Sequence, residues 1–330
     1  MPTTSISVPT VPTVNVGIDT SSTHLDGHAL PVNKTFRVTN TPAGHRKLIE
    51  DLLPLAVLPS DIRVVIESTG GLELPVALAL EQAGIQIAIV KPERVRYFAK
   101  AHGQLAKTDA IDARMLAMFC RDVKVPIIPL PPEELRHFRD LLDRRGQLVE
   151  MRTMESNRRA STHFEKALES LEKHMAWIDS EIKDIEIELD RRIAANEQWS
   201  EIDRILQSTP AIGPQTSRML IGYLPELGKV DRKAIGQLVG VAPIANDSGT
   251  TEGARHIVGG RKQVRTALYM AAVASLRWNE VCKALYKRLT KSGKKPKSAL
   301  IAVAHKLLTI VNAMVAKKTL WRDSNLAVSS

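Results

Sequence analysis

The stretch Val14-Asn15-Val16-Gly17-Ile18-Asp19 decides the fold of the first third of this 330-residue chain. Its apolar, largely β-branched residues predict a buried strand that ends on a carboxylate. A second run of the same kind, Arg63-Val64-Val65-Ile66-Glu67, also ends on an acidic residue. Further strands are expected at 34–39 and 85–90, and helices at 72–83, which Gly84 would cap, and 112–122. The alternation predicts an α/β domain with a mixed sheet over residues 14–125.

Two more carboxylates stand in Lys107-Thr108-Asp109-Ala110-Ile111-Asp112-Ala113-Arg114, just before an apolar helical stretch. Their i, i+3 spacing puts Asp109 and Asp112 on one helix face. Ligands of open α/β sheets tend to gather at the strand ends, which is where Asp19 and Glu67 fall. Clustered carboxylates repel one another unless a cation neutralises them, and hard oxygen ligands suit Mg²⁺, with Mn²⁺ as an alternative. Two such ions can clamp the attacking and leaving oxygens of a phosphodiester.

Each acid taken alone also has a structural explanation. Asp19 could cap the turn that follows its strand, and Glu67 could begin the turn into the next helix. Asp109 could cap the helix N-terminus, with Asp112 in the first turn favoured by the helix dipole. Strand-end acids combined with a D-x-x-D helix form a much rarer pattern than any of these, which favours a metal site.

The charge of the chain is unevenly placed. Residues 201–330 carry 21 Lys and Arg against 8 Asp and Glu, whereas residues 1–125 carry 13 against 12 and residues 126–200 carry 12 against 16. This excess predicts a polyanion-binding domain at the C-terminal end, with a solvated basic surface as the alternative. Because only 4% of the residues are aromatic, base stacking is not expected to be the leading mode of binding.

The remaining composition indicates a cytosolic protein. Cys120 and Cys282 are far apart and form no CxxC pair, which argues against a zinc site or a disulfide scaffold. Apolar runs are expected to stay well short of the ~18 residues of a membrane span, so no membrane partner is expected. Residues 1–13 have neither a basic n-region nor an apolar h-region and are expected to be a disordered tail rather than a signal peptide.

Four prolines between residues 126 and 132 mark a linker. Beyond it, apolar residues recur at alternating spacings of three and four, the pattern of a coiled-coil seam. The seam residues are Leu168, Leu171, Met175, Ile178, Ile182, Ile185 and Leu189. A weaker helix over 133–165 could pack back on this seam as a hairpin. Residues 126–200 are therefore interpreted as a linker followed by coiled-coil helices used for dimerisation or spacing.

Residues 201–330 are expected to form a mostly α-helical domain. The stretch Ser208-Thr209-Pro210-Ala211-Ile212-Gly213-Pro214-Gln215-Thr216 resembles the turn of a helix-hairpin-helix element, which presents backbone N–H groups to a phosphate. Ala211 stands where that turn commonly has a second glycine, and a plain turn between two helices fits the sequence about as well.

A second site is indicated by Ser248, which precedes Gly249 in a loop-like stretch. A serine beside glycine is usually only a loop residue, but a glycine-rich basic segment that follows can hold a phosphate while the hydroxyl attacks. Seven basic residues are predicted to contact nucleic acid. They are Arg255, Arg261, Lys262 and Arg265 after the serine, and Lys294, Lys295 and Lys297 in the loop before the last helix.

The order of these motifs resembles that of the DEDD-type insertion-sequence transposases, the insertion sequence one-ten family. The motifs are G-I-D (17–19), I-E-S-T-G (66–70), K-T-D-x-x-D-A-R (107–114), P-x-I-G (210–213), G-x-x-P (240–243), S-G (248–249) and R-x-A-L-Y-M (265–270). The resemblance runs from about residue 14 to residue 315. Residues 1–13 have no counterpart.

The resemblance implies a RuvC-like, RNase H-type N-terminal domain whose tetrad, Asp19, Glu67, Asp109 and Asp112, binds Mg²⁺. It implies that Ser248 forms a covalent phosphoserine link with DNA before strand exchange. It further implies an element-encoded noncoding RNA that selects donor and target DNA, homodimers and homotetramers with sites built from two protomers, and a place at the nucleoid of a prokaryotic cytosol. Glu252 stands where the family is usually more basic, which leaves open which of the following arginines contacts the scissile phosphate.

Three other functions each match part of the sequence. The first strand also resembles the phosphate loop of sugar kinases and actin-like ATPases, but the Asp-Gly pair needed for an adenosine loop occurs only at Asp26-Gly27, too early in the chain. A RuvC-like nuclease or junction resolvase would use water and would not need Ser248. A non-catalytic nucleic-acid-binding protein would not need all four acids.

Overall fold

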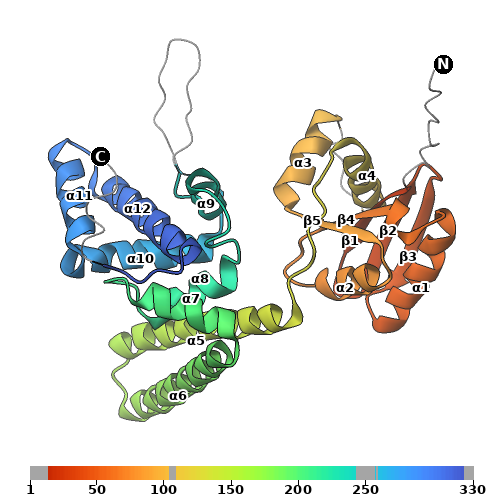
Figure 1. Cartoon of the computed structure of the whole chain (residues 1–330). Coiled ribbons are helices and arrows are strands. Elements are labelled where there is room, and N and C mark those ends of the chain that lie inside the picture. Colours follow the sequence, from red (N-terminus) through yellow and green to blue (C-terminus); the bar gives the residue numbers. More distant parts are fainter. Residues whose placement is uncertain (1–13, 104–108, 243–256, 258, 323–330) are drawn as a thin grey trace, which may run out of the picture. The chain divides into compact units, whose positions relative to one another are not determined.

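The computed structural model describes residues 14–103, 109–242, 257 and 259–322. The chain divides into two compact units, Met1–Pro131 and Pro132–Ser330, drawn in Figure 1. Each unit has hydrophobic cores of its own. The first is an α/β unit and the second is entirely helical in its described part.

A five-stranded sheet forms the centre of the first unit, in the order β3-β2-β1-β4-β5. Its strands are β1 (Val14–Thr20), β2 (His24–Leu30), β3 (Lys34–Thr39), β4 (Ile62–Glu67) and β5 (Gln86–Val90). Strand β2 is antiparallel to both β1 and β3, whereas β1, β4 and β5 are parallel to one another. The carboxyl ends of β1, β4 and β5 therefore lie along one edge of the sheet.

Helices cover both faces of this sheet (Figure 1). One core joins the sheet to α1 (Pro42–Leu52) and α2 (Leu74–Gln82), and the other joins it to α3 (Pro92–Ala101) and α4 (Asp109–Asp122). Short 3-10 turns at Leu53–Leu55 and Pro59–Asp61 lead into β4.

The predicted elements of this unit are confirmed to within three residues at each end. Strands lie at the four expected places, α2 and α4 match the two expected helices, and Gly84 follows α2 with a φ of +79°. Strand β2 and helices α1 and α3 were not predicted. The sequence of β2, His24-Leu25-Asp26-Gly27-His28-Ala29-Leu30, has a low intrinsic preference for strands, and pairing with a neighbour on each side overrides it.

Helices make up the described part of the second unit. They are α5 (Glu133–Ser161), α6 (Glu165–Ala195), α7 (Glu197–Gln207), α8 (Pro214–Tyr223), α9 (Arg232–Val239), α10 (Lys262–Trp278), α11 (Glu280–Lys291) and α12 (Pro296–Ala316). Side-chain caps fix where three of them begin: Asn196 for α7, Asp231 for α9 and Asn279 for α11.

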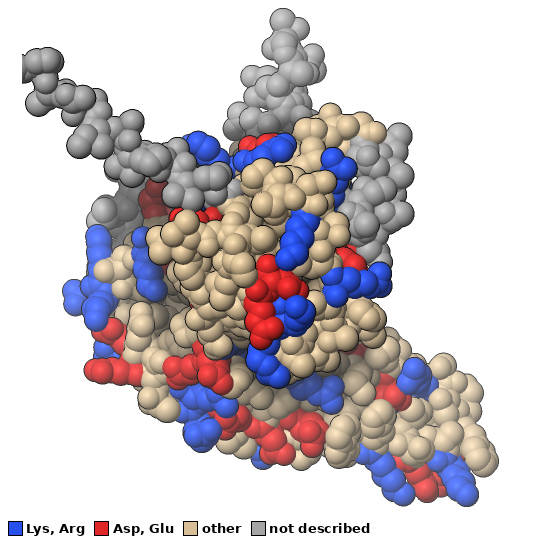
Figure 2. Space-filling model, turned by 90° about the vertical axis from the view of Figure 1, so that its right-hand side faces the viewer, with Lys and Arg blue, Asp and Glu red and all other residues tan. Residues whose placement is uncertain are grey.

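Helices α5 and α6 pack against each other as the predicted hairpin. The hairpin is closed by ion pairs along its length: Arg145–Glu186 at 2.6 Å, Arg152–Asp179 at 3.0 Å and Arg159–Glu172 at 2.9 Å. Figure 2 shows basic and acidic side chains interspersed along this hairpin at the bottom of the view. At the other end, Phe138 and Leu189 join the core formed by α7 to α12, so the base of the hairpin is continuous with the helical unit.

The expectation that no apolar run approaches membrane length was wrong. Helix α12 has 21 residues and a mean hydropathy of 1.8 over its most apolar window, enough by length and composition to cross a membrane. The apolar character of this segment is easily overlooked in the sequence because Lys297, His305 and Lys306 interrupt the apolar residues. In the structure Leu307, Leu308 and other apolar residues of α12 are buried in the core of the second unit. Its length is therefore explained by its place as a core helix.

Candidate acidic active site and nucleic-acid interface

The alternation of side chains along the strands brings Asp19 and Glu67 to the same face of the sheet. Val16 and Ile18 of β1 belong to the core with α1 and α2, so residues 15, 17 and 19 point to the α4 face. Val65 of β4 lies in the α4 core, which places Glu67 on that face as well. Ile18 pairs with Ile66 in the parallel register. Asp19 and Glu67, the next residues of the two strands, therefore lie side by side at the carboxyl edge of the sheet.

Gly17 lets α4 approach β1 more closely than any side chain would allow. A Cβ atom at Gly17 would lie 2.2 Å from the Ala117 nitrogen and 2.3 Å from the Ala113 oxygen. Further along, the thiol of Cys120 contacts the Asn15 Oδ1 at 3.5 Å. Helix α4 therefore runs antiparallel to β1, with its N-terminal half over the carboxyl end of the strand.

This direction carries the two acids of α4 towards Asp19. Position 112 is one helical turn before Leu116 and position 109 is one turn before Ala113, and both Leu116 and Ala113 are buried against the sheet. Asp112 is half-buried, while the side chain of Asp109 lies outside the described part of the structure. The fold thus brings the four predicted positions to one edge.

The described carboxylates at this edge do not form a closed metal site. Within the described side chains, no three His, Cys, Asp or Glu residues lie close enough together to hold a metal ion. The Asp19 Oδ1 accepts a hydrogen bond from the Thr20 nitrogen at 3.1 Å. The donor set consists of hard carboxylate oxygens, which fits Mg²⁺ or Mn²⁺ and does not fit a thiolate or imidazole site.

Sequence reasoning missed two acids at this edge. Asp26 pairs across from Asp19 on β2, which puts it on the same face, and it contacts Arg37 at 3.7 Å. The alternation of side chains along β2 would have placed Asp26 on this face, but β2 was not predicted as a strand. Glu73 is 7% exposed and organises the loop after Glu67, since its carboxylate accepts from the nitrogens of Thr69 (3.0 Å) and Gly71 (2.9 Å).

Ser248 and Arg255 lie outside the described residues. The ends of the segment that carries them are held together. A Cβ at Gly260 would lie 2.4 Å from the Gly240 nitrogen, and the Arg261 nitrogen donates to the Leu238 oxygen at 3.0 Å. The base of the segment is therefore a close backbone contact that only glycines permit.

Arg261 and Arg265 both have protein partners at this base. Arg261 donates to both carboxylate oxygens of Glu226, at 2.5 and 2.6 Å, and to the Tyr223 oxygen at 2.9 Å. Arg265 donates to the backbone oxygens of Gly259 and Val239, at 2.5 and 3.3 Å. These contacts give both arginines a structural role at the base, beside the phosphate-contacting role predicted for them.

The predicted lysines are exposed, and the predicted phosphate-binding turn is packed into the core. Lys262 begins α10, and Lys294, Lys295 and Lys297 surround the start of α12. In the turn between α7 and α8, Thr209 and Ile212 are buried, and Ala211 has a left-handed φ of +82°. Gly213 remains exposed at the start of α8.

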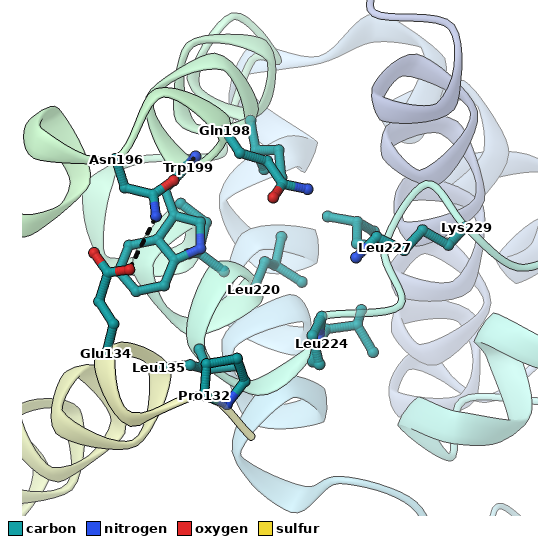
Figure 3. A pocket seen from close by; sticks show the side chains of 13 residues that line it. Pro132, Glu134, Leu135, Asn196, Gln198, Trp199, Leu220, Leu224, Leu227 and Lys229 are labelled. Atoms are coloured by element: carbon teal, nitrogen blue, oxygen red, sulfur yellow. Dashed lines mark hydrogen bonds between the residues drawn. The ribbon is translucent and has the colours of Figure 1, made fainter. Parts of the chain in front are cut away.

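A cavity of about 250 Å³ lies in the second unit among α5, α7 and α8 (Figure 3). Trp199, Leu220 and Leu224 make much of its wall apolar, and Asn196 donates to Glu134 at 3.2 Å on its rim. None of the predicted site residues lines it, so it is separate from the chemistry considered above.

Two family models match the chain. A DEDD-type transposase model of insertion sequence IS110 matches residues 16–165, and a model of the transposase IS116/IS110/IS902 family matches residues 203–287. The first covers all four acids and the second covers the segment with Ser248.

The chain belongs to the IS110 family of transposases.

Similar proteins support this family assignment. The chain is 26% identical to the pilin gene-inverting proteins of Moraxella bovis and Moraxella lacunata, over 91% of this chain and 95% of each relative. An insertion element IS110 protein of Streptomyces coelicolor is 24% identical over 41% of this chain and 34% of its own length. This transposase is therefore an enzyme of the DNA transposase and recombinase class, and DNA is its substrate.

Replacing Glu73 by alanine is expected to lower the DNA cleavage activity of the transposase about ten- to a hundred-fold. The backbone donors of Thr69 and Gly71 lose their acceptor, and the loop that follows Glu67 loses its conformation. Strand cleavage by the purified variant measures this. Glu50→Ala, at an exposed position of α1, is the matched control and should keep activity. Equal activity of Glu73→Ala and the wild type would contradict the prediction.

Replacing Glu226 by glutamine is expected to destabilise the second unit by roughly 1–2 kcal/mol at neutral pH. Burial alone would raise the pKa of Glu226, but the hydrogen bonds and charge of Arg261 outweigh it and lower the pKa. A carboxyl whose folded-state pKa is lowered stabilises the fold above its unfolded pKa, and this contribution is lost as the pH falls through the folded pKa.

The difference in stability between wild type and Glu226→Gln should therefore shrink below about pH 4. Urea unfolding at several pH values measures it. The control is Glu201→Gln, which breaks the exposed pair with Lys318 and should change stability by less than about 0.5 kcal/mol. A constant difference across the whole pH range would contradict the assignment.

Proposed function

We propose that this transposase cuts and rejoins DNA at the carboxyl edge of β1 and β4, with Asp19, Glu67, Asp109 and Asp112 binding Mg²⁺ and Ser248 as the nucleophile. One observation carries the proposal: strand parity and the close approach of α4 at Gly17 direct all four acid positions to a single edge. The gene-inverting relatives support a recombinase that rejoins the strands it cuts.

The N-terminal unit is proposed to be a RuvC-like, RNase H-type domain. Its support is the mixed five-stranded sheet, in which only β2 runs in the direction opposite to the other four strands, with helices on both faces. The proposed functional division is a tail over 1–13, the catalytic domain over 14–125, the linker and coiled-coil helices over 126–200 and the transposase domain over 201–330.

The four carboxylates would hold Mg²⁺, or Mn²⁺ in its place. When bound, such an ion supplies Lewis-acid stabilisation of the phosphoryl oxygens and of the leaving oxygen. The chain's own residues supply the geometry. Strands β1 and β4 hold Asp19 and Glu67 in register, and α4 would bring Asp109 and Asp112 over them.

The proposed covalent step uses Ser248. Its Oγ attacks the scissile phosphorus, an Oγ–P bond forms, and the bond from phosphorus to one deoxyribose oxygen breaks. The serine proton passes to solvent or a base, and the freed oxygen takes up a proton. Attack by a deoxyribose hydroxyl on the phosphoserine then reverses these bond changes and releases the serine. Arg255 and Lys262 are proposed to contact the phosphate, while Arg261 and Arg265 also hold the base of the segment.

The proposed partners are donor and target DNA, an element-encoded noncoding RNA, and further copies of the chain in homodimers and homotetramers. The excess of 21 basic over 8 acidic residues in 201–330 supports binding of nucleic acid, including contacts by Lys294, Lys295 and Lys297. The long α5–α6 hairpin supports a role in joining protomers.

A covalent-adduct assay tests the proposal. The protein is co-expressed with its flanking element DNA so that any cognate RNA is present, and then incubated with labelled junction DNA and Mg²⁺. A protein–DNA band on a denaturing gel is expected for the wild type and is expected to disappear in Ser248→Ala. The matched control is Ser292→Ala, which removes an exposed hydroxyl at the end of α11 and should leave the band unchanged. Cleavage that survives Ser248→Ala without an adduct would overturn the serine mechanism in favour of a water-using nuclease.

A further inference from the structure

Helix α3 carries a basic and aromatic outer face. Tyr97 is 71% exposed, and Arg96 and Lys100 are exposed beside it. On an α-helix, positions 96, 97 and 100 fall on one side, opposite Val95 and Phe98. The three side chains therefore form one outward surface, called here the α3 face.

The inner side of α3 fixes this surface in place. Val95 is 6% exposed and belongs to the core with α4. The rings of Phe98 and Phe119 of α4 meet edge-on with their centroids 5.3 Å apart, and the Arg94 guanidinium lies 5.6 Å from the centroid of the Phe119 ring. Figure 1 shows α3 and α4 side by side. A helix packed in this way presents its outer residues from a rigid support.

Helix α3, which carries the α3 face, starts next to the edge of the sheet where the acids lie. Val90, the last residue of β5, pairs with Glu67, and its oxygen accepts from the Ser68 nitrogen at 2.9 Å. Lys91 follows directly as the N-cap of α3. The first residue of the helix, Pro92, thus comes two residues after Val90, the neighbour of a predicted metal ligand, and α4, which carries Asp112, packs against the inner side of α3.

The charge around α3 is concentrated. Residues 1–125 are nearly balanced, with 13 basic and 12 acidic residues, but α3 and its N-cap contain four cations and one acid, Glu93. Over the ranges that the structure describes, neither Arg96 nor Lys100 forms an ion pair. Two cations that flank an exposed aromatic ring complement the phosphates and the base of a nucleic-acid strand.

We propose that the α3 face binds an unpaired segment of the DNA strand that is cut at the acidic edge. Tyr97 stacks on one exposed base, and Arg96 and Lys100 contact the adjoining phosphates. The ring offers a π-face, and a base inside a duplex has its own faces covered by stacking, so the surface suits a single strand. The inference rests on the proposed function in taking DNA as the strand at this edge.

The test uses the full-length protein in metal-free buffer, where the proposed metal-dependent cleavage is not expected to occur. The probe is a mixed-sequence single-stranded DNA carrying 5-iodouracil, which crosslinks to stacked aromatic side chains on irradiation. Binding is measured at a salt concentration that weakens purely electrostatic contacts. A crosslink to Tyr97 is expected, and Tyr97→Ala is expected to lower affinity roughly 5- to 100-fold, whereas Tyr97→Phe retains it.

Two matched controls separate the α3 face from general effects. Phe164→Ala removes an aromatic ring that is also 71% exposed, at the start of α6, and Arg46→Ala removes an exposed cation from α1 on the opposite face of the sheet. Both should bind like the wild type, and Arg96→Ala should bind several-fold more weakly. The same oligonucleotide as duplex DNA and as RNA provides the comparison of partners.

Several outcomes would overturn the inference. These are a crosslink elsewhere in the chain, equal affinity of Tyr97→Ala and wild type, or a Tyr97-dependent affinity confined to duplex DNA or to RNA. The proposed function is tested by a different measurement, since the adduct and the acid-dependent cleavage are assayed in the presence of Mg²⁺. Its failure can therefore be distinguished from failure of the present inference. Cleavage that depends on Asp19 but not on Tyr97 would overturn the inference about the α3 face and leave the proposed function standing.

Discussion

Replacement of Asp19 by asparagine is expected to lower DNA cleavage by about a thousand-fold or more while leaving the fold intact. Asp19 lies at the end of the central strand β1, and asparagine keeps its size while removing the negative charge that would hold the metal ion. Metal stabilisation of a phosphoryl transition state is worth several kcal/mol, and each 1.4 kcal/mol is about ten-fold in rate. Single-turnover cleavage of junction DNA measures the effect.

The matched control for this variant is Asp122→Asn. Asp122 lies at the other end of α4, paired with Arg121 at 2.6 Å, and its loss should leave cleavage within about two-fold of the wild type. Asp19→Cys adds a test of the metal, because a softer thiolate favours Mn²⁺ over Mg²⁺ and should restore part of the activity only with Mn²⁺. Full activity of Asp19→Asn would remove Asp19 from the site.

Replacement of Gly17 by alanine is expected to destabilise the first unit by about 1–3 kcal/mol and to lower cleavage about a hundred-fold. The new methyl group would fall on the backbone of α4, 2.2 Å from the Ala117 nitrogen, and backbone cannot move aside as a side chain does. Helix α4 must shift, and Asp109 and Asp112 shift with it. Chemical unfolding and cleavage on the same preparation measure both effects.

Gly27→Ala is the control for this prediction. The two glycines lie on neighbouring strands, but a Cβ at Gly27 would first meet the side chain of Phe36 at 3.3 Å, and a ring can rotate or shift slightly. We expect a loss of stability below about 1 kcal/mol and nearly normal cleavage. Similar losses in the two variants would show that the close approach of α4 is not specific to Gly17.

Asp19 and Gly17 are linked by the geometry of β1. They lie on the same face of the strand, so the residue that admits α4 is the one next to the acid on that face. The conservative change at Asp19 removes charge without moving the helix, and the change at Gly17 moves the helix without removing charge. Comparing them separates the chemistry of the carboxylates from their placement.

The sequence by itself determined the strands that carry Asp19 and Glu67, the helix that carries Asp112 and the two long helices α5 and α6. These follow from local periodicity, since a period of two or of three to four fixes which residues face a core. The four acids could be chosen because carboxylates at element ends are recognisable in the chain.

Only the tertiary structure decided the rest. Strand β2 and the place of Asp26 beside Asp19 depend on pairing with neighbours, which local propensity does not encode. Arg261 resembles a phosphate ligand in the sequence, but its bidentate contact with Glu226, 35 residues away, appears only on folding. The same holds for the nearness of α3 to the acidic edge, because the registers of β4 and β5 and the packing of Phe98 on Phe119 set it. Residues distant in sequence meet only when the sheet fixes its order and register.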